Sequence, residues 1–273
     1  MDAKEIKNLE DKSKFIRGLI IKEIYKIGEG HAGGSLSAVE ALVVLYYKVM
    51  NINPKDPDMI GRDRFIMSKG HAGPAVYAVL ADKGYFDVSE LDTLNKPGTN
   101  LPSHCDMNKT KGIDMTVGSL GQGISCAVGM AKASKIMKDN AYIYCMIGDG
   151  ESQEGQVWEA AMAASQFKLN NLICFVDYNK IQLDDTVENI MNVAPLDKKW
   201  EAFGWKVISI DGHDVEKIYS SIIEAKDSKE KPTMIILNTI KGKGVKIIEE
   251  MGVANHSMKI SEEIKNMALK ELE

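Results

Sequence analysis

The sequence predicts an α/β fold, built as a parallel sheet with helices on both of its faces. Short apolar runs of strand length alternate with segments of helical periodicity, such as 154–167 and the segment from Val215 onward. The apolar runs are 141–147, 171–176, 205–210 and 233–240. Such alternation is typical of parallel strands joined by helices that cover both sides of the sheet. The chain has 273 residues, 44% of them hydrophobic, which favours one large domain over residues 1–273.

The part of the chain before these runs is predicted to be mainly helical. Apolar residues recur at helical spacing over residues 6–27, and Gly28 then supplies a stop signal. A second helix is predicted over about 37–50. A turn-rich connection then leads to a short strand at 64–67, which ends at the segment SKGHAG.

Composition and charge exclude several classes of partner. The net charge is −5 and the positive residues are scattered among acidic ones, so no basic stripe is present for nucleic acid. The charged segments 226–231 and 240–246 are predicted to be solvated loops and not binding patches. No signal peptide is apparent, and the longest apolar run is too short to span a membrane. The four cysteines form no CxxC pair, which suits buried thiols in the cytoplasm.

A carboxylate between two glycines follows one of the apolar runs. Asp149 lies between Gly148 and Gly150, where a strand is predicted to end and a helix to begin. At this edge of a parallel sheet, free N–H groups and the helix dipole favour anions. Asn179 follows the next apolar run, so its amide oxygen and the carbonyl of Ile181 can join Asp149 around one cation. Magnesium uses one or two protein carboxylates with phosphate and water, so the pattern indicates a magnesium-bound phosphate group.

This GDG segment, followed about thirty residues later by an asparagine, resembles the thiamine diphosphate motif. Nearly the whole chain resembles the amino-terminal half of transketolase, which implies the diphosphate half of the thiamine diphosphate-binding fold. By this resemblance, Asp149, Asn179 and the carbonyl of Ile181 hold Mg²⁺, or another divalent cation such as Ca²⁺ or Mn²⁺. Gly148 and Gly150 then belong to the cofactor site, with Gly150 against the diphosphate.

The same resemblance implies further residues around the cofactor. The loop VGSLGQGI is similar to the family's segment that lines the cofactor site, and its residues there are Gly118, Leu120 and Gln122. Glu154 matches the acidic residue that the family places at its subunit interface, and it is counted with the cofactor site. In the loop after Asn179, Asp185 stands where the family usually has glycine.

Four of the five histidines lie in segments similar to transketolase motifs. They are His31 in GEGHAGGS, His71 in SKGHAGP, His104 in LPSHCD and His256 in NHSMKIS. Imidazoles donate hydrogen bonds to phosphate and hydroxyl groups and relay protons near neutral pH. The resemblance implies that these four form a catalytic cluster, with His71 at the diphosphate and the others facing the sugar beside Ser35. The fifth, His213, is interpreted as a turn residue before a helix.

The resemblance also implies a second chain. In transketolases the glutamate that activates the cofactor, the aromatic pocket around its pyrimidine ring and most sugar-phosphate arginines belong to the other half. The arginines here are Arg17, Arg62 and Arg64. We therefore expect a carboxy-terminal, pyrimidine-binding partner subunit in an α2β2 assembly, with sugar phosphates as substrates and neither nucleic acid nor membrane as partner.

Three functions are open at this point. The first is a transketolase subunit that, with its partner, transfers a two-carbon ketol unit from a ketose phosphate to an aldose phosphate using thiamine diphosphate. The second is the diphosphate-binding subunit of a 2-oxo acid dehydrogenase or decarboxylase, which shares the GDG spacing but has less use for several histidines. The third is a non-catalytic assembly subunit.

Overall fold

The computed structural model describes residues 1–273 and has a five-stranded parallel sheet at its centre. The strand order is β2-β3-β4-β6-β5, and every neighbouring pair is parallel. The strands are β2 (Arg64–Met67), β3 (Ile143–Gly148), β4 (Leu172–Tyr178), β5 (Lys206–Asp211) and β6 (Thr233–Asn238). The predicted fold class is therefore confirmed, and the strand boundaries shift from the prediction by no more than two residues.

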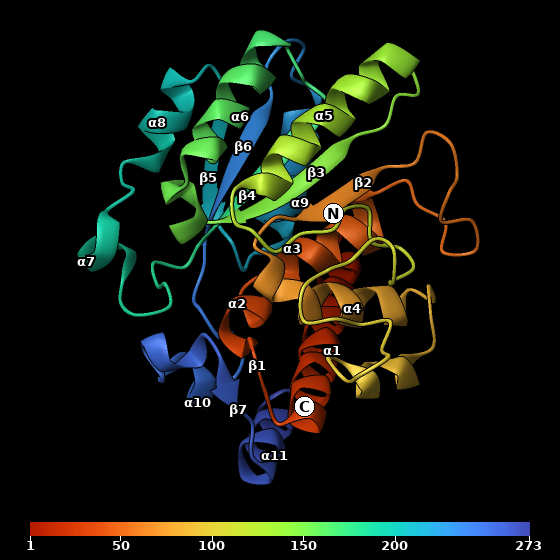
Figure 1. Cartoon of the computed structure of the whole chain (residues 1–273), viewed down its shortest axis with the longest axis vertical. Coiled ribbons are helices and arrows are strands. Elements are labelled where there is room, and N and C mark those ends of the chain that lie inside the picture. The colour runs from red at the N-terminus through yellow and green to blue at the C-terminus, as the bar shows by residue number, and fades with distance from the viewer.

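Helices surround this sheet (Figure 1). They are α1 (Ala3–Ile27), α2 (Ala32–Leu36), α3 (Val39–Val44), α4 (Gly73–Asp82), α5 (Gln122–Met137), α6 (Gly155–Gln166), α7 (Val187–Met191), α8 (Leu196–Ala202), α9 (Val215–Lys226), α10 (Lys246–Glu249) and α11 (Glu262–Glu271). Short 3₁₀ turns lie at Gly70–Ala72, Val88–Thr93, Gly150–Gln153 and Gly252–Asn255. Asp214 caps α9 as predicted, since its side chain accepts the N–H groups of Glu216 and Lys217. No helix is both long and apolar enough to cross a membrane.

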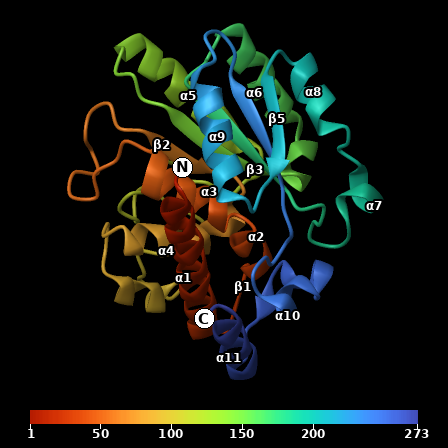
Figure 2. The ribbon, with the colours of Figure 1, turned by 180° about the vertical axis from the view of Figure 1, so that it is seen from behind.

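The two faces of the sheet bury two separate hydrophobic clusters. Helices α5 and α6 lie in front of the sheet in Figure 1, and α9 lies in front of it in the view from behind (Figure 2). Alternate residues of β3 point to opposite faces, so Tyr144 and Met146 join one cluster while Cys145 and Ile147 join the other. Because both faces are covered, every residue of β3 is buried, which explains the unbroken apolar run in the sequence.

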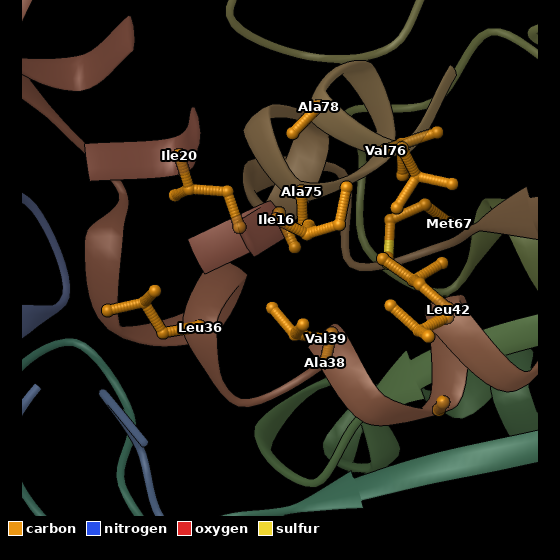
Figure 3. Packing of buried hydrophobic residues seen from close by; sticks show 14 of the residues in the cluster. Ile16, Ile20, Leu36, Ala38, Val39, Leu42, Met67, Ala75, Val76 and Ala78 are labelled. Carbon is orange, nitrogen blue, oxygen red and sulfur yellow. The ribbon is translucent and has the colours of Figure 1, made fainter. Parts of the chain in front are cut away.

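Helix α1 packs on one of these clusters. It begins with a capping box between Asp2 and Glu5 and ends at Gly28, whose φ of 89° suits glycine. Its fully buried residues Ile16 and Ile20 recur one turn apart and pack near residues of α2, α3 and α4 (Figure 3). The predicted amphipathic helix over 6–27 is confirmed, and it anchors the segment that carries His31.

The second predicted helix, over about 37–50, is confirmed, since α3 and a π-helical turn over Leu45–Val49 together span residues 39–49. The prediction missed α2, a short helix that precedes it, and the helical structure breaks between α2 and α3. The break follows from Ser37, whose hydroxyl bonds the carbonyl of Gly34 and the carboxylate of Asp177. A serine that bonds local backbone competes with the helical ladder.

A second, two-stranded sheet joins distant parts of the chain. Strand β1 (Glu29–Gly30) pairs antiparallel with β7 (Met258–Lys259), and both lie below the large sheet in Figure 1. This pairing brings the segment before β7, which contains His256, next to the segment after β1, which contains His31.

The two glycines of α5 are expected to respond in opposite ways to alanine. A Cβ at Gly123 would lie 2.7 Å from the Cα of Ser68, whereas a Cβ at Gly129 would meet nothing within 4 Å. Gly123→Ala should lower the free energy of unfolding by about 1–3 kcal/mol through overpacking. Gly129→Ala should raise it by about 0.5–1 kcal/mol, because alanine favours the helix. Urea unfolding of both variants tests this, and equal effects would contradict the packing described here.

Candidate functional site

A cavity of about 350 Å³ lies at the carboxyl ends of β2, β3 and β4. Because these strands are parallel, the residues that follow them meet at one edge of the sheet. Every predicted cofactor, metal and catalytic residue except Gln122 lines this cavity. They are His31, His71, His104, Gly118, Leu120, Gly148, Asp149, Gly150, Glu154, Asn179, Ile181 and His256. The structure thus brings together residues that are up to 225 positions apart in the chain, from 31 to 256.

The four histidine rings lie together, as the resemblance of their segments implies, and their catalytic role stays a prediction. His31 lies centrally, with ring centroids 5.6 Å from His71, 5.9 Å from His104 and 5.4 Å from His256. The rings of His71 and His256 are 4.9 Å apart. The supporting hydroxyl of Ser35 donates to the carbonyl of His31 at 2.7 Å and is itself fully buried. Four loops that are separate in the sequence therefore meet at this cavity.

The environment keeps these imidazoles neutral. Burial lowers the pKa of all four, and the Lys69 ammonium lowers that of His71 further. For His256, burial and the nearby Lys241 ammonium lower the pKa to about 3. A neutral imidazole has one N–H donor and one acceptor nitrogen, so each ring can both give and take a hydrogen bond at neutral pH.

Asp149 is a buried carboxylate whose negative charge a nearby cation would stabilise. It is 3% exposed, and it accepts the backbone N–H groups of Gly150 at 2.7 Å and Lys180 at 2.5 Å. Burial, together with the charge of Asp177, raises its pKa to about 7. Since a cation beside a buried carboxylate offsets its desolvation, this site fits a divalent metal ion.

Asn179 and Ile181 offer the oxygen atoms that would complete such a metal site. The side-chain N–H of Asn179 donates to Asp177 at 2.9 Å, which orients the amide. Its oxygen accepts the N–H of Ile181 at 3.1 Å and keeps a second lone pair for a cation. The carbonyl of Ile181 accepts from the Lys241 ammonium at 3.2 Å. These are hard oxygen ligands of the type that magnesium prefers.

Two buried charges that the sequence reasoning missed hold this edge together. Lys69 is 1% exposed, and its ammonium donates to Asp177 and to the carbonyl of Gly34, both at 2.6 Å. Burial alone would raise the pKa of Asp177, but the Lys69 ammonium holds it below its usual value. The sequence did carry a signal for Asp177, because it is a carboxylate inside the apolar run FVDYN. A charged residue in such a run is as unusual as Asp149 is at its position.

Lys241 corrects the prediction that the segment 240–246 is a solvated loop. Its side chain is 3% exposed, lines the cavity and bonds the carbonyls of Ile181 and Gln182. The ammonium also lies 3.0 Å from Nδ1 of His256. Because an ammonium is only a donor, Nδ1 accepts and Nε2 of His256 carries the hydrogen. Burial and the charge of Lys69 lower the pKa of Lys241 to about 8. Lys246, in the same segment, is exposed as predicted.

Glu151 ties three loops of the cavity to one another. It is 2% exposed and accepts the Ser68 hydroxyl, the Gly121 N–H at 2.9 Å and the Gly148 N–H at 3.0 Å. These donors follow β2, precede α5 and end β3, respectively. Sequence reasoning missed Glu151 because it lies two residues beyond the aspartate that drew attention.

The lining also carries donors that suit an anion. Gln182 Nε2 is buried without a hydrogen-bond partner, and its side chain lies near Gly150. The ammonium groups of Lys69 and Lys241 line the same cavity. Because Asp149 supplies a negative charge in the same space, the cavity suits an anionic group bridged to a cation, as a metal-bound diphosphate is.

Three of the residues singled out in the sequence do not lie in the deepest part of the cavity. The Gln122 side chain lies outside it and exchanges hydrogen bonds with Gln156 at 2.6 and 3.0 Å. Its cofactor role therefore stays a prediction. Glu154 lies at the rim and is exposed. Asp185, in place of the expected glycine, has no positive φ, and its carbonyl accepts the N–H of Gln182 at 2.9 Å, so this turn does not require glycine.

Loss of the Glu151 carboxylate should destabilise the fold. Glu151→Ala leaves the buried N–H groups of Gly121 and Gly148 unpaired, which should cost about 2–4 kcal/mol of unfolding free energy. Glu159→Ala, on an exposed position of α6, is the matched control and should change it by less than about 0.5 kcal/mol. Denaturant unfolding measures both, and similar losses would refute the role assigned to Glu151.

Acid should destabilise the chain through His256. The pKa of its imidazole is about 3 in the folded chain, against an ordinary value of 6.5, so the folded state binds fewer protons. This contribution to stability is present above pH 6.5 and is lost as the pH falls toward 3. Lowering the pH from about 7.5 to about 5.5 should therefore lower the Tm by a few degrees, and His256→Asn should flatten this dependence. An unchanged slope in the variant would contradict the assignment.

Comparison with known proteins agrees with this geometry. Residues 10–270 match the family model described as "Transketolase, thiamine diphosphate binding domain". The chain is 54% identical over 266 residues to the 6-deoxy-6-sulfo-D-fructose transketolase subunit SqwG of Clostridium sp. (strain MSTE9), covering 97% of this chain and 96% of that subunit. It is 40% identical over 265 residues to an apulose-4-phosphate transketolase subunit of Actinobacillus succinogenes, covering 97% and 95%.

Solved structures give the same result. The transketolase of Campylobacter jejuni superposes with a TM-score of 0.91 at 32% identity, and covers 100% of this chain. The match covers 43% of that longer chain. The two subunits named above are, in contrast, of nearly the same length as this chain. The chain therefore belongs to the transketolase family, as an amino-terminal, thiamine diphosphate-binding subunit of the kind found in split transketolases.

Proposed function

We propose that residues 1–273 form one diphosphate-binding domain that works with a carboxy-terminal partner subunit to transfer a two-carbon ketol unit between sugars. One observation carries this proposal above all: four histidines and the Asp149, Asn179 and Ile181 oxygen atoms line the same cavity. A 2-oxo acid dehydrogenase or decarboxylase would explain the oxygen atoms but not the histidines. The relatives compared above are all named as transketolases or their subunits, which also favours ketol transfer.

Charged and polar side chains, together with backbone groups that no side chain covers, would hold the cofactor. Asp149, Asn179 and the Ile181 carbonyl would hold Mg²⁺, while Gly150, His71 and Lys241 would face the diphosphate. Gly118 leaves open space, since a Cβ there would meet nothing within 4 Å. When bound, thiamine diphosphate would supply the carbanion-stabilising chemistry that breaks and forms the C–C bond.

The histidines would orient the sugar and move its protons. Neutral His31 and His104 can each donate a hydrogen bond to a hydroxyl and accept a proton from another. His256 is fixed as an Nε2–H donor by Lys241 at its Nδ1. With four rings within 6 Å of a neighbour, a proton released from a substrate hydroxyl has several acceptors within reach.

The substrates proposed are sugars with a terminal oxyanion. One relative acts, by its name, on 6-deoxy-6-sulfo-D-fructose and another on apulose 4-phosphate. Both names describe a ketose that carries an acidic group on a carbon outside the two-carbon ketol unit. We propose that this chain also uses a ketose donor of that class and an aldose acceptor.

The partner would complete the site from the side of Glu154. Glu154 is exposed at the rim of the cavity, beside the exposed side chain of Leu120. Of the three arginines, Arg17 pairs with Glu40 and Arg62 with Asp114, and none lines the cavity. The pyrimidine-binding residues would come from the partner, in an α2β2 complex. The reduced cysteines agree with the cytoplasm as the proposed location.

Removal of the Asp149 charge tests the metal site. In the complex reconstituted with the partner subunit, Asp149→Asn should weaken Mg²⁺-dependent thiamine diphosphate binding at least about 100-fold and abolish ketol transfer, because the carboxylate charge that balances the metal ion is lost. Asp184→Asn, exposed in the nearby loop and outside the cavity, should change neither. Titration calorimetry and a coupled assay with ketose phosphate measure the two quantities.

The outcomes separate the three functions. Unchanged cofactor affinity in Asp149→Asn would favour the assembly subunit. Turnover of 2-oxo acids without ketol transfer would favour the dehydrogenase or decarboxylase. Full ketol transfer by the chain without its partner would contradict the split site.

A further inference from the structure

We propose that a network of largely buried side chains outside the cofactor cavity positions Lys241 within it. The network, called the supporting triad below, consists of Arg17, Glu40 and His213, and none of the three lines the cavity. They hold the backbone of the segment that carries Lys241, so they are positioning residues and not catalytic ones. In the proposed function, on which this inference rests, Lys241 faces the diphosphate. The triad also gives a role to the histidine that lies apart from the cluster.

The segment that carries Lys241 has little tendency to keep one conformation by itself. It reads IKGKGV over residues 240–245, and it lies between β6 and α10. Gly242 and Gly244 both have a φ of 89°, which glycine adopts readily and other residues rarely do. Glycine loses more backbone freedom on folding than any other residue. Contacts from outside the segment are therefore needed to keep the Lys241 side chain turned inward.

His213 holds the segment on the amino side of Lys241. Its Nε2 lies 2.8 Å from the backbone nitrogen of Ile240, and its Nδ1 lies 3.1 Å from a carboxylate oxygen of Glu40. Because a backbone N–H is only a donor, Nε2 accepts, and Nδ1 carries the hydrogen and donates to Glu40. A single tautomer satisfies both contacts, so the imidazole bridges Glu40 and the residue before Lys241.

Arg17 holds the segment on the carboxyl side of Lys241. Its Nε donates to the carbonyl of Lys243 at 2.7 Å, and its Nη2 donates to Glu40 at 2.8 Å. This approach depends on Gly244, because a Cβ there would lie 2.7 Å from both Cδ and Nε of Arg17. The triad therefore holds the backbone on both sides of Lys241.

Glu40 joins the two arms of the triad. It is buried, and it accepts from both Arg17 and His213. Burial alone would raise the pKa of Glu40, but the Arg17 charge and the His213 hydrogen bond hold it below its ordinary value. The three residues lie in α1, in α3 and in the turn before α9. The triad thus ties a glycine-rich loop to three elements of the folded core.

Lys241 is in this way restrained at both of its ends. The triad holds the backbone from outside, and the ammonium bonds the carbonyls of Ile181 and Gln182 inside the cavity. A side chain ordered before its ligand arrives loses less entropy on binding. Lys69 is equally buried and lines the same cavity, but its ion pair with Asp177 holds it. It therefore serves as an internal reference for Lys241.

Lysine labelling tests this positioning without the cofactor. The reconstituted complex, free of thiamine diphosphate, is treated with acetic anhydride, and mass spectrometry gives the labelling rate of each lysine. His213→Ala should raise the rate at Lys241 at least about fivefold through local opening, because the Ile240 N–H loses its acceptor. The rate at Lys69 should stay within about twofold, since its partners are unchanged. An equal rise at both lysines would mean general loosening and would overturn the inference.

A double-mutant cycle tests whether the triad acts through Lys241. Titration calorimetry measures thiamine diphosphate affinity in the presence of Mg²⁺. Lys241→Ala and His213→Ala should each weaken binding about 10-fold or more, as the loss of an outer-shell contact commonly does. The double variant should lose no more than about threefold beyond Lys241→Ala alone, because coupled residues are not additive. Fully additive losses would show that His213 acts by another route.

Two further variants separate positioning from stability. His213→Gln keeps an amide oxygen for the Ile240 N–H and an amide N–H for Glu40, so it should restore binding to within about threefold. Ser134→Ala is the matched stability control, because buried Ser134 donates to the carbonyl of Ala141 outside the cavity and the triad. It should lower the Tm by a few degrees and leave cofactor affinity and labelling unchanged.

Failure of this inference is distinguishable from failure of the proposed function. If Lys241→Ala weakens cofactor binding but His213→Ala does not, the triad does not position Lys241. If Lys241→Ala leaves the affinity unchanged, Lys241 does not face the diphosphate, and the inference fails with that assignment. If the unmodified complex binds thiamine diphosphate yet transfers no ketol unit, the proposed function fails, while labelling and binding still decide the role of the triad.

Discussion

The buried ion pair between Lys69 and Asp177 is the interaction on which the rest of the site depends. Asp177 is fully buried, and it accepts from Lys69, from Ser37 at 2.7 Å, from Asn179 at 2.9 Å and from Thr239. These donors come from the ends of β2, β4 and β6 and from the break between α2 and α3. Because loss of one partner of such a pair costs about 3–5 kcal/mol, four segments are held in register by one carboxylate.

This constraint shapes the electrostatics of the cavity. The Lys69 ammonium balances the negative charge of Asp177. Asp149 is then the carboxylate whose charge a bound cation would stabilise. Lys241, held by two carbonyl groups, provides a second ammonium close to His256. The cavity thus holds both ammonium groups and a carboxylate, which suits a diphosphate together with a metal ion. Burial lowers the pKa of all four histidines, and both lysines lower that of His71 and His256 further.

The sequence predicts the sheet, the covering helices and the Asp149 and Asn179 positions, since apolar periodicity and the ends of parallel strands follow local rules. The histidines and the other lining residues are predicted from the resemblance of their segments to transketolase motifs. It does not reveal that Lys241 folds inward, because the glycine-rich segment IKGKGVK has the composition of a solvated loop. Asp177 is visible in the sequence as a carboxylate inside the apolar run FVDYN, but its pairing with Lys69 escapes prediction because the two residues are 108 positions apart. The helix predicted over 37–50 leaves out α2, which ends at Leu36, because the contact of Ser37 with Asp177 at the break between α2 and α3 is tertiary.

The pairing of β1 with β7 sets an order of events during synthesis. The large sheet is complete once residue 238 has been made, yet His256 and the strand that places it follow later. Asn255, fully buried, lies against Gly33 at the start of α2. A nascent chain can therefore form its sheet before the histidine cluster is complete. It can bind a ligand at this cluster only once the segment around residue 256 has left the ribosome.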